Sequence, residues 1–114
     1  MTINANNYAI AMTRGDSESL TVKKKNDVWA DGEVITFTVR DGADGEILLQ
    51  KAVSEFDDEG AAVIAIDPAD TEGIDFGSYV YDIQYSNAAG TVTTLIPPKP
   101  GKLPKFTLTE EATY

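Results

Sequence analysis

The sequence predicts an all-β protein, built as an antiparallel β-sandwich of about 7–8 strands. Three observations lead to this prediction. Apolar residues recur at every second position along most of the chain, which is the period of a β-strand. Turn-forming residues, mainly glycine after an acidic residue, separate the alternating runs at short intervals. Helical periodicity is almost absent from the chain.

The expected strands are the runs in which apolar and polar residues alternate, or in which apolar residues follow one another. In the clearest run Ile35, Phe37 and Val39 alternate with polar residues. The runs are 8–12, 20–22, 35–40, 47–53, 61–66, 79–85, 92–96 and 106–108.

Turn chemistry accounts for the ends of these runs. Asp31-Gly32, Asp41-Gly42 and Glu59-Gly60 each supply a glycine that can adopt a positive φ. Asp67 suits a helix N-cap and Pro68 a first helical position, so we expect at most one short helical turn, near residues 68–74. No repeat or boundary divides the chain, and we expect a single domain over residues 1–114.

The composition excludes several classes of protein. The chain has 114 residues, 42% of them apolar, which suffices for one core and is too apolar for disorder. The sequence has no run of about 18 apolar residues, so no membrane-spanning helix is expected. We identify no signal peptide at the N-terminus. Cysteine and histidine are absent, which excludes disulfides, cysteine-bound metals and histidine-based catalysis. A net charge of -10 argues against a nucleic-acid partner.

No group of residues forms a recognisable catalytic, cofactor or metal site, so we expect a protein that is not an enzyme. A serine nucleophile would need an activating lysine, and no sequence context suggests one. The acidic run at 57–59 precedes Gly60 and is typical of a hairpin turn. Asp41 and Asp44 lack the spacing of an EF-hand loop, and calcium binding by these turn carboxylates is left open.

Six residues are candidates for contact with a partner. Trp29 lies in a predicted loop, where it either closes one end of the sandwich or anchors a partner. The proline segment either forms a ligand for an SH3-type groove or, as we favour, a stiff connector between strands. The candidates are Trp29, Lys23, Lys24, Lys25, Pro97 and Pro98.

Tyr79, Tyr81, Ile83 and Tyr85 share one face of a predicted strand. An aromatic face of this kind either packs in the core or stacks on sugar rings. We favour the core because the face includes an aliphatic residue.

The same strand begins with the pattern Asp-x-Gly-x-Tyr, formed by Asp75, Gly77 and Tyr79. This pattern is typical of an immunoglobulin-like tyrosine corner, in which the tyrosine hydroxyl bonds to nearby backbone. Tyr81 then occupies the place of the second cysteine of antibody domains. We therefore expect an immunoglobulin-like sandwich without its disulfide.

Four motifs follow one another along the chain. A Gly-Asp pair (Gly15-Asp16) comes after the first strand, and an F-T-V-R strand occupies 37–40. A D-T…G-x-Y-x-Y-D-I run then covers 70–83, and a G-x-V-x-T-L hairpin covers 90–95. In this order and spacing the motifs resemble the N-terminal domain of the upper baseplate proteins of tailed phages and prophages that infect Gram-positive bacteria.

The resemblance implies an immunoglobulin-like sandwich that is a structural part of a virion, made in the bacterial cytoplasm and located in the tail or baseplate. Its partners would be other tail or baseplate proteins, and a homo-oligomer is left open. The long C-terminal extension of that family is not matched, so trimer formation and attachment of receptor-binding proteins are not carried over.

Two other functions stay open. The segment 15–39 also resembles the immunoglobulin-like modules of bacterial surface adhesins. A small carbohydrate-binding module is a further alternative, which would require the tyrosines to face outward.

Arg14-Gly15-Asp16 spells the tripeptide that integrins bind, yet we interpret it as a joint between two strands. Gly15 suits a positive-φ turn, and Asp16 can accept a hydrogen bond from the backbone amides near Ser17 or Glu18. The resemblance requires Gly-Asp and not Arg14. We therefore expect the fold to depend on Gly15 and to be nearly indifferent to Arg14.

Overall fold

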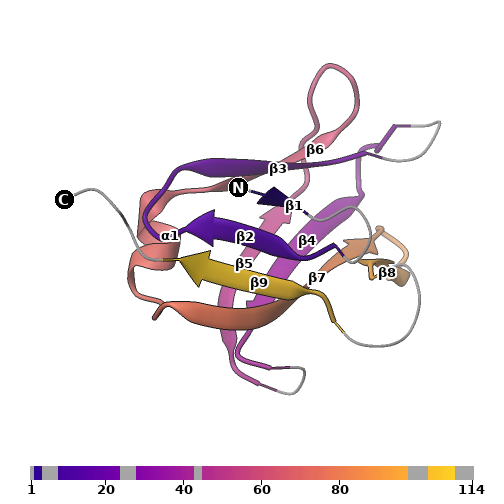
Figure 1. Cartoon of the computed structure of the whole chain (residues 1–114). Helices are drawn as coiled ribbons and strands as arrows, with labels where there is room; N and C mark the ends of the chain where they lie inside the picture. Colours follow the sequence, from indigo (N-terminus) through magenta and orange to yellow (C-terminus); the bar gives the residue numbers. More distant parts are fainter. Residues whose placement is uncertain (1, 4–7, 24–27, 43–44, 98–102, 110–114) are drawn as a thin grey trace.

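The structure is a computed structural model that describes residues 2–3, 8–23, 28–42, 45–97 and 103–109. Within these ranges the chain forms nine strands and one short helix (Figure 1). The elements are β1 (Thr2–Ile3), β2 (Ile10–Thr13), β3 (Glu18–Val22), β4 (Val34–Arg40), β5 (Ile47–Val53), β6 (Ala62–Ile66), α1 (Pro68–Glu72), β7 (Gly77–Ser86), β8 (Val92–Ile96) and β9 (Lys105–Thr109).

The strands form two sheets, and the predicted all-β sandwich is confirmed. The larger sheet has the order β1-β2-β9-β7-β4-β5, with β8 also paired to β7, and the smaller sheet consists of β3 and β6. The prediction of antiparallel pairing is wrong for one pair, because β2 and β9 run parallel. These two strands come from opposite ends of the chain, so no short hairpin forces them to be antiparallel.

Strands β8 and β9 share one edge of β7. Strand β4 pairs with residues 80–86 of β7 along the opposite edge. On the shared edge, Ile96 at the end of β8 lies opposite Ile83, and Lys105 at the start of β9 lies opposite Val80. Strands β8 and β9 therefore lie one after the other along the same edge of β7.

The core lies between the two sheets. The alternating residues of β4 and β7 turn one side inward, and the apolar residues of β6 meet them from the smaller sheet. Phe37 is at the centre, with its ring centroid 5.5 Å from that of Tyr81 and 5.9 Å from that of Phe106. Burial of each large apolar side chain contributes roughly 1.5–3 kcal/mol. The largest fully buried apolar side chains are Phe37, Phe106, Ile10, Ile35, Ile64, Ile66, Leu108 and Val39.

Helix α1 lies between β6 and β7 at one end of the sandwich (Figure 1), where the sequence predicts a helical turn. It begins after Asp67, which is the N-cap, and Pro68 fills its first turn. Asp70 completes a capping box with Asp67. Thr71 is the buried member of the helix, and its side chain points toward the rest of the fold.

Candidate functional site

The turn Arg14-Gly15-Asp16 joins β2 to β3 and is attached to α1. Gly15 has a φ of +86°, the positive value that the sequence predicts. Its amide donates a hydrogen bond of 2.9 Å to Oγ1 of Thr71, which is fully buried. An L side chain at this φ is strained, so the position suits glycine for a structural reason.

Arg14 lies against the body of the protein. Its amide donates to the carbonyl of Thr109 (3.1 Å), and its Nη1 donates to the carbonyl of Ile74 (3.4 Å). The guanidinium carbon lies 4.0 Å from the centroid of the Phe76 ring. Integrin recognition would require Arg14 to extend from a loop tip, and this packing is the opposite arrangement.

Asp16 closes the turn through its backbone. Its amide donates to the carbonyl of Thr13 (3.2 Å) and closes the turn. The hydrogen bond predicted for its carboxylate, from the amides near Ser17 or Glu18, stays a prediction. The Asp16 side chain is exposed.

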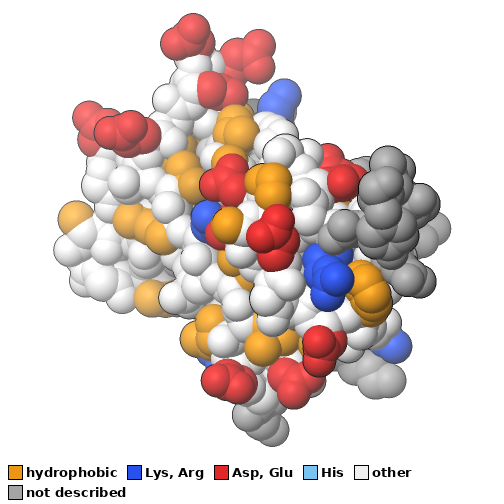
Figure 2. All heavy atoms as spheres, turned by 90° about the vertical axis from the view of Figure 1, so that its left-hand side faces the viewer, with side chains coloured by type: hydrophobic (Ala, Val, Ile, Leu, Met, Phe, Trp, Pro, Cys, Tyr) orange, Lys and Arg blue, Asp and Glu red, His pale blue; other side chains and the backbone are white. Residues whose placement is uncertain are grey.

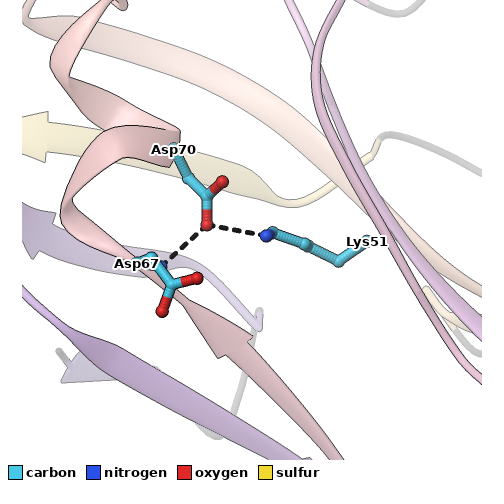
Figure 3. A network of polar contacts seen from close by, with 3 residues as sticks. All are labelled: Lys51, Asp67 and Asp70. Carbon is cyan, nitrogen blue, oxygen red and sulfur yellow. Dashed lines mark hydrogen bonds and ion pairs between the residues drawn. The ribbon is translucent and has the colours of Figure 1, made fainter.

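An ion pair connects α1 to the edge strand β5 (Figure 3). Asp70 Oδ2 lies 2.9 Å from Lys51 Nζ, and the same oxygen accepts a hydrogen bond of 2.7 Å from the Asp67 amide. Burial alone would raise the pKa of the Asp70 carboxyl. The hydrogen bonds from Lys51 and Asp67, together with the Lys51 charge, outweigh burial and hold this pKa below its usual value.

Tyr79 forms the hydroxyl-to-backbone contact of a tyrosine corner. Its hydroxyl donates to the carbonyl of Asp75, four residues earlier, over 2.6 Å. Burial and the charges of Asp75 and Asp41 raise the pKa of Tyr79, which keeps the hydroxyl protonated as a donor. Gly77 precedes this contact with a φ of +150°. The pattern Asp-x-Gly-x-Tyr thus corresponds to a turn in which Gly77 has a positive φ and the Tyr79 hydroxyl bonds to the Asp75 carbonyl.

The other members of the tyrosine face turn toward the core. Tyr81 and Ile83 are buried, while Tyr79 and Tyr85 are half-buried and pack against the same cluster. The Tyr81 hydroxyl donates to the carbonyl of Tyr8, and burial, with a smaller effect of Tyr8, raises the pKa of Tyr81 to about 12. A sugar-stacking platform needs exposed rings, whereas the tyrosines of this strand pack against the core.

Trp29 closes one end of the sandwich, the first of the two roles considered for it. Its side chain is only 7% exposed, and its ring stacks on Tyr85 with 5.6 Å between centroids. The indole Nε1 donates to the carbonyl of Val22 (3.0 Å), and the amide donates to that of Gly60 (3.0 Å). A side chain held in this way offers little surface to a partner.

The remaining candidates for partner contact are spread over the chain. Lys23 is exposed directly after β3, and Pro97 is half-buried directly after β8. Lys24, Lys25 and Pro98 lie outside the described residues. The structure therefore brings no basic cluster or proline groove together among the residues it describes.

The acidic turns have structural roles. Asp57 Oδ1 accepts hydrogen bonds from the amides of Glu59 and Ala61, both at 2.9 Å, and so shapes the turn between β5 and β6. Asp41 begins the hairpin between β4 and β5, where its amide donates to the Glu46 carbonyl (3.0 Å). Among the described residues, no three metal-binding side chains are grouped closely enough to hold an ion.

Strand β8 corresponds to the predicted strand 92–96, and it was not among the six candidates for partner contact. It pairs with β7 along one edge, and Val92 is 61% exposed, with Thr93 and Thr94 also exposed. No residue from 83 to 98 is charged, although 25% of the chain is. At the α1 end of the molecule, by contrast, acidic side chains are spread over the surface (Figure 2). The uncharged run is the signal in the sequence that marks this strand.

An apolar cleft of about 270 Å³ lies between the two sheets near this strand. Leu20 and Val22 of β3 line one side, and Ile83 of β7 and Ile96 of β8 line the other.

The described part of the chain contains no helix with the length and apolar character needed to cross a membrane.

Comparison of the chain with protein-family models and with curated proteins gave no match.

Proposed function

We propose that this protein is a non-enzymatic structural component of a phage or prophage tail or baseplate, where an immunoglobulin-like sandwich docks to other virion proteins. The proposal rests on the motifs that resemble the upper baseplate family and on the way in which the fold connects them.

The observation that carries the proposal is the hydrogen bond from the Gly15 amide to Thr71 Oγ1 (2.9 Å). Gly15 belongs to the Gly-Asp motif that follows the first strand, and Thr71 belongs to the Asp-Thr motif before β7. The two motifs are 56 positions apart in the chain, yet they form one joint. This contact gives a structural reason for the two motifs to occur together in one fold, and in this way it supports the resemblance.

The strand order and the tyrosine corner support the immunoglobulin-like part of the proposal. The sheet order β9-β7-β4-β5, opposite the pair β3 and β6, is compatible with the order of neighbours in an immunoglobulin sandwich, to which β8 is an addition on the edge of β7. The Tyr79 hydroxyl makes the corner contact at the start of β7. Tyr81, two residues later, fills the buried position where antibody domains have a cysteine.

The test is the composition of phage particles. The chain carrying a short affinity tag would be expressed in a lysogen, the prophage induced, and the particles separated on a density gradient. We expect the tagged chain to sediment with intact tails and with isolated baseplates. The same tagged chain in a strain cured of the prophage is the control and should stay at the top of the gradient.

Two results would count against the proposal. A chain that never enters the particle fractions is not a virion component. A chain recovered in the cell-wall fraction, with neighbouring genes for secretion and anchoring, would instead support the adhesin alternative.

A further inference from the structure

Strand β8 is an edge strand of the larger sheet, and its first three residues are exposed. Within the described residues its partner is β7 alone, and its other edge is unpaired. Charges, prolines and bulges normally prevent another strand from adding to an edge strand. The pairing of β8 with β7 shifts register between Thr94 and Ile96, and Pro97 follows the strand, so residues 92–94 are the regular part of this edge. Val92, Thr93 and Thr94 are exposed, uncharged and suited to β structure.

The hydrogen bonding of the hairpin shows which backbone groups point outward. The Asn87 amide donates to the Thr91 carbonyl (3.2 Å), so these two residues form a hydrogen-bonded pair. Such pairs alternate along an antiparallel ladder, and Thr93 is therefore in the next one. Val92 and Thr94 lie in the non-bonded pairs. Their amide and carbonyl groups consequently point away from β7, toward the free edge.

We propose that β8 pairs with β8 of a second copy of this chain, antiparallel about a two-fold axis. In this register Val92 of each copy exchanges hydrogen bonds with Thr94 of the other, and Thr93 faces its own counterpart on the axis. The result is one continuous sheet that runs from β5 of one copy to β5 of the other. This pairing is a property of the chain in solution and does not depend on a place in a virion.

The charges of the chain favour a second copy as the occupant. Pairing about a two-fold axis places identical residues near each other, and like charges opposite each other are destabilising. The edge strands β5 and β3 contain Lys51 and Glu18, and β6 is an uncharged edge strand of apolar residues. Strand β8 is uncharged as well, and pairing about the axis opposes threonine to threonine, a favourable cross-strand pair. A basic partner steered by charge would be drawn to the acidic surface rather than to this neutral edge. The net charge of each copy is screened beyond about 8 Å at physiological salt.

The predicted dimer is weak, because a strand edge buries less area than the roughly 1,000 Å² of a stable interface. We expect a dissociation constant on the order of 10–100 µM. Sedimentation equilibrium of the full chain, from about 10 µM to about 1 mM, brackets this range. The mass should rise from the 12.3 kDa of the monomer toward twice that value.

Thr94→Pro tests the backbone contact. It removes an amide that faces the free edge and leaves the bonds to β7 in place, as proline at an edge can. We expect this variant to stay monomeric over the whole range, with an unchanged far-UV circular dichroism spectrum. Thr94→Ala keeps the amide and is the matched control, which should dimerise like the parent chain.

Thr93 supplies a second test that does not require a proline. Thr93→Lys and Thr93→Glu should each dimerise at least tenfold more weakly, because like charges meet on the axis. An equal mixture of the two variants should restore the dimer. The inference is overturned if the parent chain is monomeric at about 1 mM, if folded Thr94→Pro dimerises like the parent, or if the mixture stays monomeric.

Discussion

At the scale of single residues, the tripeptide Arg14-Gly15-Asp16 is a part of the fold. Gly15 supplies a positive φ and a hydrogen bond to the buried Thr71. Arg14 covers Phe76 and reaches the carbonyl of Ile74. The contacts of these three residues with the helix and with neighbouring backbone thus indicate a structural role for the tripeptide.

Gly15→Val is expected to destabilise the protein. A β-branched side chain at a φ of +86° costs roughly 1–2 kcal/mol from backbone strain alone. Urea unfolding followed by Trp29 fluorescence measures the loss. Gly15→Asn is the matched control, because asparagine tolerates this region better and should lose less. Equal losses for the two variants would show that φ is not the cause.

Arg14→Ala is also expected to destabilise, in contrast to the expectation from sequence that Arg14 matters little. A cation over an aromatic ring contributes roughly 0.5–1 kcal/mol when exposed, and the contact with the Ile74 carbonyl is lost as well. The same unfolding measurement compares Arg14→Ala with Arg14→Lys, which keeps the charge. If Arg14→Ala leaves the free energy of unfolding unchanged, Arg14 does not contribute to stability, and the expectation from sequence is correct.

At the scale of elements, α1 is stabilised from two sides. The Thr71 hydroxyl accepts the Gly15 amide, and Asp70 joins the helix to β5 through Lys51. A helix of five residues does not form alone in water. Its stability therefore depends on these contacts and on its capping box.

The Asp70 contact makes part of the stability depend on pH. The pKa of Asp70 is lower in the folded protein than its ordinary value of 3.8, so protonation weakens the folded state. The contribution is fully present above about pH 5 and is lost as the pH falls through the folded pKa, below about pH 4. Asp70→Asn keeps a side-chain acceptor for the cap and removes the charge.

The measurement is the difference in unfolding free energy between the parent chain and Asp70→Asn. At about pH 7 we expect roughly 0.5–1 kcal/mol in favour of the parent, because the pair is partly exposed (the Asp70 side chain is 19% exposed). At about pH 3 the difference should shrink. Lys51→Met, which removes the other partner, should lose the same pH dependence. A difference independent of pH would assign the effect to the cap alone.

The elements also show how far the sequence allows prediction. Alternation placed β4 and β7 correctly, and Asp67 with Pro68 located α1. Asp75, Gly77 and Tyr79 marked the corner, since that contact is local in the chain. The alternation of apolar and polar residues specifies which face of a strand is buried, but it does not specify which other strands pair with it. The parallel pairing of β2 with β9 was for this reason not predicted.

The candidate site was harder to predict than the fold. Trp29 was recognised as a residue of interest, but its two roles could be separated only once Tyr85 and the Val22 carbonyl were placed beside it. The importance of β8 depends on which edge of the sheet remains unpaired. That is a property of the assembled sheet and not of the five residues themselves.

At the scale of the whole molecule, the charges are unevenly distributed along the chain. The chain carries a net charge of -10, and acidic side chains are visible across the α1 end (Figure 2). The hairpin of β7 and β8 carries no charge from residue 83 onward. A molecule with this distribution repels its copies in most orientations, and β8 offers an uncharged approach.

The parallel pairing of β2 with β9 has a mechanical consequence. β2 lies near the beginning of the chain and β9 near its end, and the two strands run side by side in the same direction (Figure 1). A force that pulls the two ends apart would slide these strands past each other and load their hydrogen bonds together, rather than opening them one after another. Tension between the two ends of the chain is therefore resisted by the pairing of β2 with β9.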